Sequence, residues 1–245
     1  RPMLDLLPWM LLFFVPAVTM RSLAEDARTG TIEVVLAQPL TELEFLIGKY
    51  LGQVACLWIA LALTLPIPLA LALGATTQVG VVFAQYVGAA LLMAGLAGVG
   101  VWASSVTKNQ ITSFILAVAV TFVLILVGLD PLLVGLPPTL GILAARLGVL
   151  SHFTHLARGV IDLRDALYFA TLAAMFLALA YLFLMRRRLS PASGPIRRLR
   201  LGTLLLVSAM VVLNLFGGYI GGRLDLTPGG AYTLSAGTKD ILKQL

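Results

Sequence analysis

The sequence predicts an all-α membrane protein, a polytopic helical bundle with six spans. Of its 245 residues, 60% are apolar and only 11% are charged, whereas an ordinary soluble domain has about 45–50% apolar and about 25% charged residues. A soluble globule of this length could not bury so much apolar surface. This composition argues against a soluble enzyme, a disordered protein, a disulfide-rich secreted domain and a nucleic-acid-binding protein.

Long apolar stretches without central charges give the number of spans. About 20 mostly apolar residues are needed to cross a hydrocarbon core of about 30 Å. Pro8 and Pro16 lie in the first stretch, and Pro66 and Pro68 predict a kink near the outer end of the second. The six stretches run roughly over residues 4–20, 51–73, 81–104, 111–129, 166–185 and 201–220.

Small side chains mark one face of the third stretch, including Gly88, Gly95 and Gly98. Such residues allow helix backbones to approach closely in lipid. We expect this face to pack against helices of the same chain, and a dimer interface is the alternative.

The basic residues predict the orientation. The net charge is +6, but six of the 17 basic residues lie within residues 186–200, with no acidic residue among them. Cytoplasmic loops carry such an excess of arginine and lysine. Alternation then places residues 21–50 and 104–110 in the cytoplasm as well, and residues 74–80, 130–165 and 221–245 outside. We therefore expect a multi-pass protein of the plasma (bacterial inner) membrane, embedded in the lipid bilayer, with no nucleic-acid partner.

The cytoplasmic segment 21–50 is too polar to span the membrane, yet it is patterned. Thr29–Thr31 offers hydroxyl caps for a short helix over residues 32–37, which Pro39 would end. Thr41 and Glu44 form a capping box, from which a helix can run into the second span. The segment suits docking into a groove of a partner. A helix lying on lipid is the alternative, but five acidic residues against three basic ones argue against it.

The segment contains Glu25-x-x-Arg28-x-Gly30-Thr31-Ile32-Glu33-x-x-Leu36, then Gln38-Pro39-Leu40-Thr41 and Gly48-Lys49. These residues resemble the coupling-helix region of type-2 ABC transporter permeases, and the resemblance extends from residue 4 to about residue 185. The GldG-like residues near the C-terminus, described below, suggest that the permease resembles the gliding-motility GldF kind. The resemblance implies that residues 1–188 form a permease domain with five of the family's six spans, the first span preceding this sequence.

The resemblance also implies a function and partners. The chain would be the permease subunit of an ATP-driven exporter, working as a homodimer or heterodimer with a second permease copy. The segment would dock onto a separate ATP-binding subunit, which would hold ATP and Mg. The implied contact residues are Glu25, Arg28, Gly30, Thr31, Glu33 and Pro39.

Missing motifs agree with a permease that is not itself an enzyme and binds no cofactor. No G-x-x-x-x-G-K-[ST] phosphate loop occurs, so the ATP chemistry would belong to another subunit. The spans contain almost no ionisable residues, although ion-coupled transporters use such groups. A non-transport membrane anchor of a motility or envelope machine is the alternative function, and ATP-dependent movement of a substrate in proteoliposomes would separate the two.

The external stretch 136–165 predicts a re-entrant helical hairpin with pieces at 140–147 and 152–160, broken by Gly148. Its two histidines, His152 and His155, could share a helix face, but no third metal ligand has supporting spacing. We therefore expect interfacial histidines rather than a metal site. The nearby charged residues are expected to form exposed charge pairs: Arg158, Asp162, Arg164 and Asp165.

The C-terminal part departs from a plain permease. Residues 189–200 read as a basic cytoplasmic linker and residues 201–220 as an extra transmembrane anchor. Residues 221–245 resemble the opening of an extracytoplasmic GldG-type auxiliary subunit, which suggests a fusion of permease and auxiliary subunit. A simple C-terminal tail is the alternative.

Overall fold

The computed structural model describes residues 6–31, 40–74, 78–129, 131, 135, 137–188, 194–217 and 222–226. Within these residues six helices are long and apolar enough to cross a membrane. The prediction of an all-α polytopic bundle with six spans is confirmed. Two short strands, which the sequence did not predict, are added at one end.

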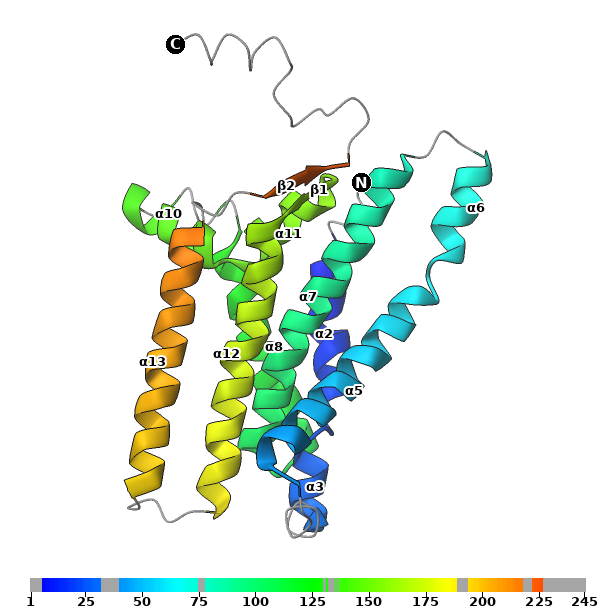
Figure 1. Cartoon of the computed structure of the whole chain (residues 1–245). Coiled ribbons are helices and arrows are strands. Elements are labelled where there is room, and N and C mark those ends of the chain that lie inside the picture. Colours follow the sequence, from blue (N-terminus) through cyan, green and yellow to red (C-terminus); the bar gives the residue numbers. More distant parts are fainter. Residues whose placement is uncertain are drawn as a thin grey trace.

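The helices alternate in direction along the chain (Figure 1). One end of the bundle, the α3 end, carries α3, the turn between α7 and α8, and the start of α13. The opposite end, the hairpin end, carries α10, α11 and the strands. The main elements are α2 (Leu7–Thr19), α3 (Ala24–Thr29), α5 (Glu42–Ala62), α6 (Pro66–Gly74), α7 (Val79–Val106), α8 (Gln110–Val127), α10 (Pro138–Leu147), α11 (Val149–Ala157), α12 (Leu163–Arg188) and α13 (Gly194–Phe216).

Proline breaks the second span where the sequence predicted a kink. Helix α5 ends at Ala62, and α6 begins at Pro66 after a short turn. Proline has no backbone N–H, and its ring clashes with the carbonyl four residues earlier, so a helix cannot continue undisturbed through Pro66. Figure 1 shows that α5 and α6 lean away from the other helices toward the hairpin end.

Helix α7 lies at the centre and contacts α2, α5, α8, α11 and α12. Its small residues make these contacts close. A Cβ added to Gly98 would lie 2.8 Å from the Cα of Ala173 in α12, and one added to Gly88 would lie 2.8 Å from the Cβ of Leu156 in α11. Gly95 faces Phe169 of α12. The three glycines therefore pack against helices of the same chain, and another surface would have to serve a dimer.

The hairpin end is built from two short helices and a strand pair. Helices α10 and α11 meet at a bend of 66° at Gly148, close to the predicted pieces. Strand β1 (Val160–Asp162) pairs in antiparallel register with β2 (Arg223–Asp225). Residues 222–226 therefore return to the bundle after α13 and lie against its hairpin end.

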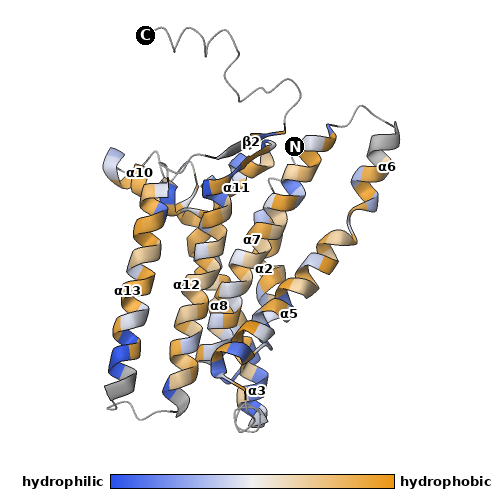
Figure 2. Cartoon of the chain, in the orientation of Figure 1, coloured by the Kyte–Doolittle hydropathy of each residue, from blue (hydrophilic) through white to orange (hydrophobic). Residues whose placement is uncertain are grey.

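The outer surface of the bundle is suited to lipid. In the 18-residue apolar stretch of α13, only 6% of the residues are buried inside the chain. In that of the α5–α6 span, the share is 11%. Figure 2 shows apolar residues along the middle of the helices and hydrophilic residues at α3, at the start of α13 and at the hairpin end. The polar residues thus gather at the two levels where a bilayer ends.

Candidate functional site

The segment predicted to dock onto a partner begins with α3, a helix of six residues at the end of the bundle. Glu25 and Asp26 lie in its first turn and Arg28 in its last, an order that complements the helix dipole. Gly30 then adopts a φ of 75°, and a left-handed residue of this kind commonly ends a helix. The order of charges and the glycine together explain why the helix covers these residues.

The N-terminus of α3 is capped from another helix. Leu23 precedes α3 and has no side chain that could cap it. Instead, the backbone N–H groups of Leu23 and Ala24 donate to the hydroxyl oxygen of Ser104 in α7, at 2.9 and 2.8 Å. The Ser104 hydroxyl donates in turn to the carbonyl of Met20, at 3.1 Å. The buried serine thus uses its one donor and both acceptor positions to fix the corner between α2 and α3.

Two further contacts attach α3 to the bundle. The ammonium of Lys49 in α5 lies 2.6 Å from the carboxylate of Asp26. Leu23 packs in a buried cluster with Leu46 of α5, Val101 of α7 and Ala180 of α12. The base of α3 is therefore held by three membrane-spanning helices, and a force on α3 would reach all of them.

The tip of the segment faces outward. The side chain of Arg28 is 63% exposed and pairs with Glu25 of the preceding turn. The hydroxyl of Thr29 donates to the carbonyl of Glu25 at 3.0 Å and lies 2.7 Å from that of Thr31. A Cβ added to Gly30 would meet nothing within 4 Å. Three of the six predicted contact residues, Arg28, Gly30 and Thr31, are thus together on this tip, and Glu25 is joined to it through Arg28. Glu33 and Pro39 lie outside the described residues.

The sequence predicted a further helix over residues 32–37, with hydroxyl caps from Thr29–Thr31, and residues 32–37 lie outside the described residues. Within the described part, the Thr29 hydroxyl donates to the carbonyl of Glu25 in α3 and lies 2.7 Å from the Thr31 hydroxyl. Thr31 is itself helical, directly after Gly30.

The start of α5 is as predicted. The Thr41 hydroxyl accepts from the N–H of Glu44 at 3.3 Å, and the Glu44 carboxylate accepts from the N–H of Thr41 at 2.9 Å. This capping box is confirmed, and α5 runs from it through Gly48 and Lys49 into the span. The chain therefore re-enters the membrane along a helix whose first turn is fixed.

A second polar cluster lies buried at the hairpin end. The Nδ1 of His152 lies 2.6 Å from the carboxylate of Asp165, and its Nε2 lies 3.0 Å from the carbonyl of Arg146. Both partners are acceptors, so both bonds form together only when each ring nitrogen carries a proton. The ring also stacks on Tyr168 at 4.0 Å, and the Tyr168 hydroxyl donates to the carbonyl of Leu147.

This cluster corrects one prediction. Asp165 was expected in an exposed charge pair, yet it is 0% exposed, because α11 covers the first turn of α12 and brings His152 onto it. His155 lies 3.6 Å and Arg164 3.7 Å from the same carboxylate. Among the described residues, no group of three His, Cys, Asp or Glu side chains has the geometry of a metal site. His152 joins α11 to α12 through this carboxylate and to α10 through the carbonyl of Arg146.

These features define a class of protein: a polytopic membrane bundle with a small, rigidly attached polar helix at one end. The family described as ABC-2 family transporter protein matches residues 10–189, and the chain belongs to this family. It is a membrane permease component of an ABC transporter, in a family whose permeases normally work with an ATP-binding subunit and are not themselves ATPases. No curated protein and no solved structure matches the chain.

Sequence reasoning missed the residues that attach the site. Ser104 lies 81 and 80 residues from the two backbone groups it caps, and Lys49 lies 23 residues from Asp26, so no local spacing joins them. One weak signal exists, since Ser104 and Ser105 are neighbouring hydroxyl residues at the end of an otherwise apolar stretch.

Proposed function

We propose that this chain is the permease subunit of an ATP-driven exporter of a bacterial inner membrane, and that residues 25–31 dock onto a separate ATP-binding subunit. ATP and Mg would be held by that subunit. One observation carries the proposal: α3 has an exposed tip, Arg28 to Thr31, and a firmly attached base. Ser104 caps the base of α3, and Asp26 pairs with Lys49 of α5.

The distribution of charge supports the orientation that this function needs. Three stretches at the α3 end carry basic residues, for example Arg28, Lys108 and Arg198. Figure 2 shows hydrophilic residues at α3 and at the start of α13. An excess of arginine and lysine in short loops is typical of the cytoplasmic side. The α3 end would then face the cytoplasm, where ATP is found.

A mechanism follows from the attachments of α3. Closure of the ATP-binding subunits would push on the tip, and the hydroxyl of Ser104 would pass the movement to α7, while Asp26 would pass it to α5 through Lys49. Because α7 packs tightly against α12 along its glycine face, these helices would move together. Two permease copies rocking in this way would open a path between them.

Charge reversal at the tip tests the proposed contact. In the purified complex, Arg28→Glu is expected to lower stimulation of the ATPase roughly tenfold, the equivalent of about 1.4 kcal/mol of lost interaction. The reason is that an exposed cation facing the partner becomes an anion. The measurement is ATP hydrolysis by the co-purified subunit, with and without the permease.

Lys108→Glu is the matched control, because Lys108 is also exposed and lies at the α3 end but outside the docking tip. We expect it to retain stimulation. Equal behaviour of the two variants, whether both lose or both keep stimulation, would contradict the proposed docking site.

We also propose a more specific relationship of this chain within its family. The resemblance of residues 221–245 to a GldG-type auxiliary subunit suggests a gliding-motility-type permease fused to that subunit. The pairing of Leu224 with Ile161 supports it, because residues 222–226 lie against the permease as the start of a joined subunit would. Deleting residues 189–245 should then leave the contact between tip and ATP-binding subunit intact.

A further inference from the structure

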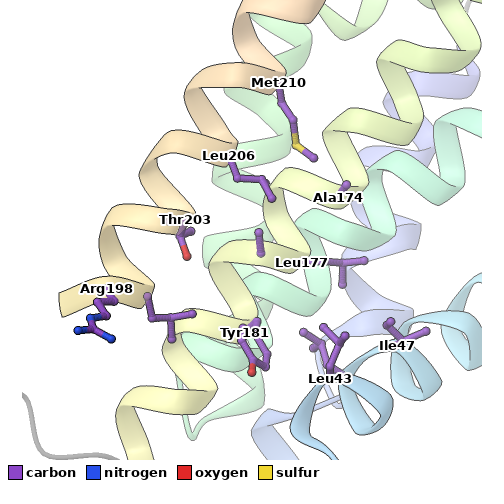
Figure 3. A pocket seen from close by; sticks show the side chains of 13 residues that line it. Leu43, Ile47, Ala174, Leu177, Tyr181, Arg198, Thr203, Leu206 and Met210 are labelled. Carbon is purple, nitrogen blue, oxygen red and sulfur yellow. The ribbon is translucent and has the colours of Figure 1, made fainter. Parts of the chain in front are cut away.

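An apolar groove opens between α5, α12 and α13 toward the α3 end of the bundle. It has a volume of about 730 Å³, and thirteen residues line it. Leu43 and Ile47 come from α5, Leu177 and Tyr181 from α12, and Leu206 from α13, and Figure 3 shows these side chains around the opening. Arg198 is the one charged residue among the thirteen.

Small side chains keep the groove open. Ala174 and Ala178 line it from α12, and Gly202 lines it from α13. A Cβ added to Gly202 would meet nothing within 4 Å. The space between α12 and α13 is therefore a hollow that the chain's own described side chains leave unfilled.

The length of the groove matches one leaflet of a bilayer. Its lining runs along α13 from Arg198 to Met210, which is twelve residues or about 18 Å of helix. Half of a hydrocarbon core of about 30 Å is about 15 Å. Arg198 and Tyr181 lie at one end of the groove and Met210 at the other (Figure 3). The polar end thus lies at the level of headgroups and the apolar end near the middle of the membrane.

The polar end has the chemistry of a phosphate site. The guanidinium of Arg198 offers several N–H donors in a planar fork that fits a phosphate, and the hydroxyl residues Tyr181 and Thr203 also line the groove. Arg197 and Arg200 in the same turn of α13 add positive charge. Glu42 and Glu44 flank Leu43, but they do not line the groove, and the Glu44 carboxylate is taken by Thr41. Basic clusters of this kind attract anionic lipids.

We propose that this groove binds an anionic phospholipid, with its phosphate at Arg198 and one acyl chain along Leu177, Leu206 and Met210. The lipid would fill the space between α12 and α13 and fix α13, which is otherwise the least buried span, against the permease. This site does not depend on the coupling contact at α3.

Native mass spectrometry of the purified protein tests the proposal with phosphatidylglycerol and zwitterionic phosphatidylcholine as probes. The unmodified protein should retain one phosphatidylglycerol per chain in preference to phosphatidylcholine. Gly202→Leu fills the groove without changing charge, and Arg198→Gln removes the phosphate contact. Each should lower retention of phosphatidylglycerol roughly fivefold or more.

Two matched variants serve as controls. Gly52→Leu makes the same change at an α5 glycine that also has nothing within 4 Å and does not line the groove, and Lys108→Gln removes one positive charge from an exposed residue of the α3 end that does not line the groove. Both should retain the lipid. Equal retention of the two lipids, or equal loss in the test and control variants, would overturn the proposal. A disulfide between two chains carrying Thr203→Cys in a Cys56→Ser background would also overturn it, because a second copy would then occupy the groove.

Discussion

His152→Leu is expected to lower the free energy of unfolding by about 3 kcal/mol, because it leaves the buried carboxylate of Asp165 without its closest hydrogen-bond partner. Asp165 is 0% exposed and its closest partner is the His152 ring. For a chain of this size, such a loss corresponds to a fall of roughly 6–12 °C in the midpoint of thermal unfolding. Thermal unfolding of the purified protein in detergent measures it.

Two further variants make this expectation specific. His155→Leu should change the midpoint little, since the His155 side chain is 42% exposed and 3.6 Å from the carboxylate, and exposed ion pairs contribute at most about 1 kcal/mol. His152→Leu combined with Asp165→Leu should recover most of the loss, because an apolar pair needs no charge compensation. If the double variant were as unstable as the single one, the buried pair would not be the cause.

Ser104→Ala is expected to release α3 from the bundle. The substitution leaves two buried backbone N–H groups without an acceptor, which costs about 2 kcal/mol and should raise amide hydrogen exchange at Leu23 and Ala24 roughly 30-fold. An isolated helix of six residues is not stable in water, so α3 should fray locally while the spans remain folded. Stimulation of the ATPase should fall with it, if α3 is the coupling contact.

Ser113→Ala is the matched control for this change. Ser113 is also 0% exposed, but its hydroxyl has no hydrogen-bond partner among the residues that the structure describes, so its removal should be neutral. Unchanged exchange at Leu23 in the Ser104 variant would show that the cap from α7 does not hold α3.

Local patterns allowed accurate predictions where the interacting residues are close in sequence. Thr41 and Glu44 are three residues apart, and their side chains form the predicted reciprocal bonds. Pro66 breaks the second span because the effect of proline acts on the carbonyl four residues earlier. The number of spans also follows from sequence, because bilayer thickness sets the length of each apolar stretch.

Ambiguous and long-range features were harder to predict. Helix α3 was not predicted, although its acidic first turn, Glu25 and Asp26, and the Gly30 that ends it are local signals of a helix. The glycines of α7 predict close packing, but only the fold selects Ala173 and Leu156 as their neighbours. In the sequence, Asp165 cannot be distinguished from an exposed acidic residue at the start of a helix. Only the fold shows that α11 covers it.

The charge pairs show the same limit. Lys49 has no acidic residue three or four positions away on its own helix, and it pairs with Asp26 of α3. The choice depends on how the chain between α3 and α5 returns to the bundle, which spacing alone does not determine.

The central claim is that the exposed tip of α3 contacts an ATP-binding subunit in the cytoplasm. The most direct measurement places a photo-crosslinking group on Thr31→Cys, in a background where the single cysteine is removed by Cys56→Ser, and activates it in intact cells. Thr31 is exposed and directly follows Gly30, so the group reaches the partner without disturbing the base of α3. The account predicts a crosslink to the ATP-binding subunit; crosslinks to lipid alone would contradict it.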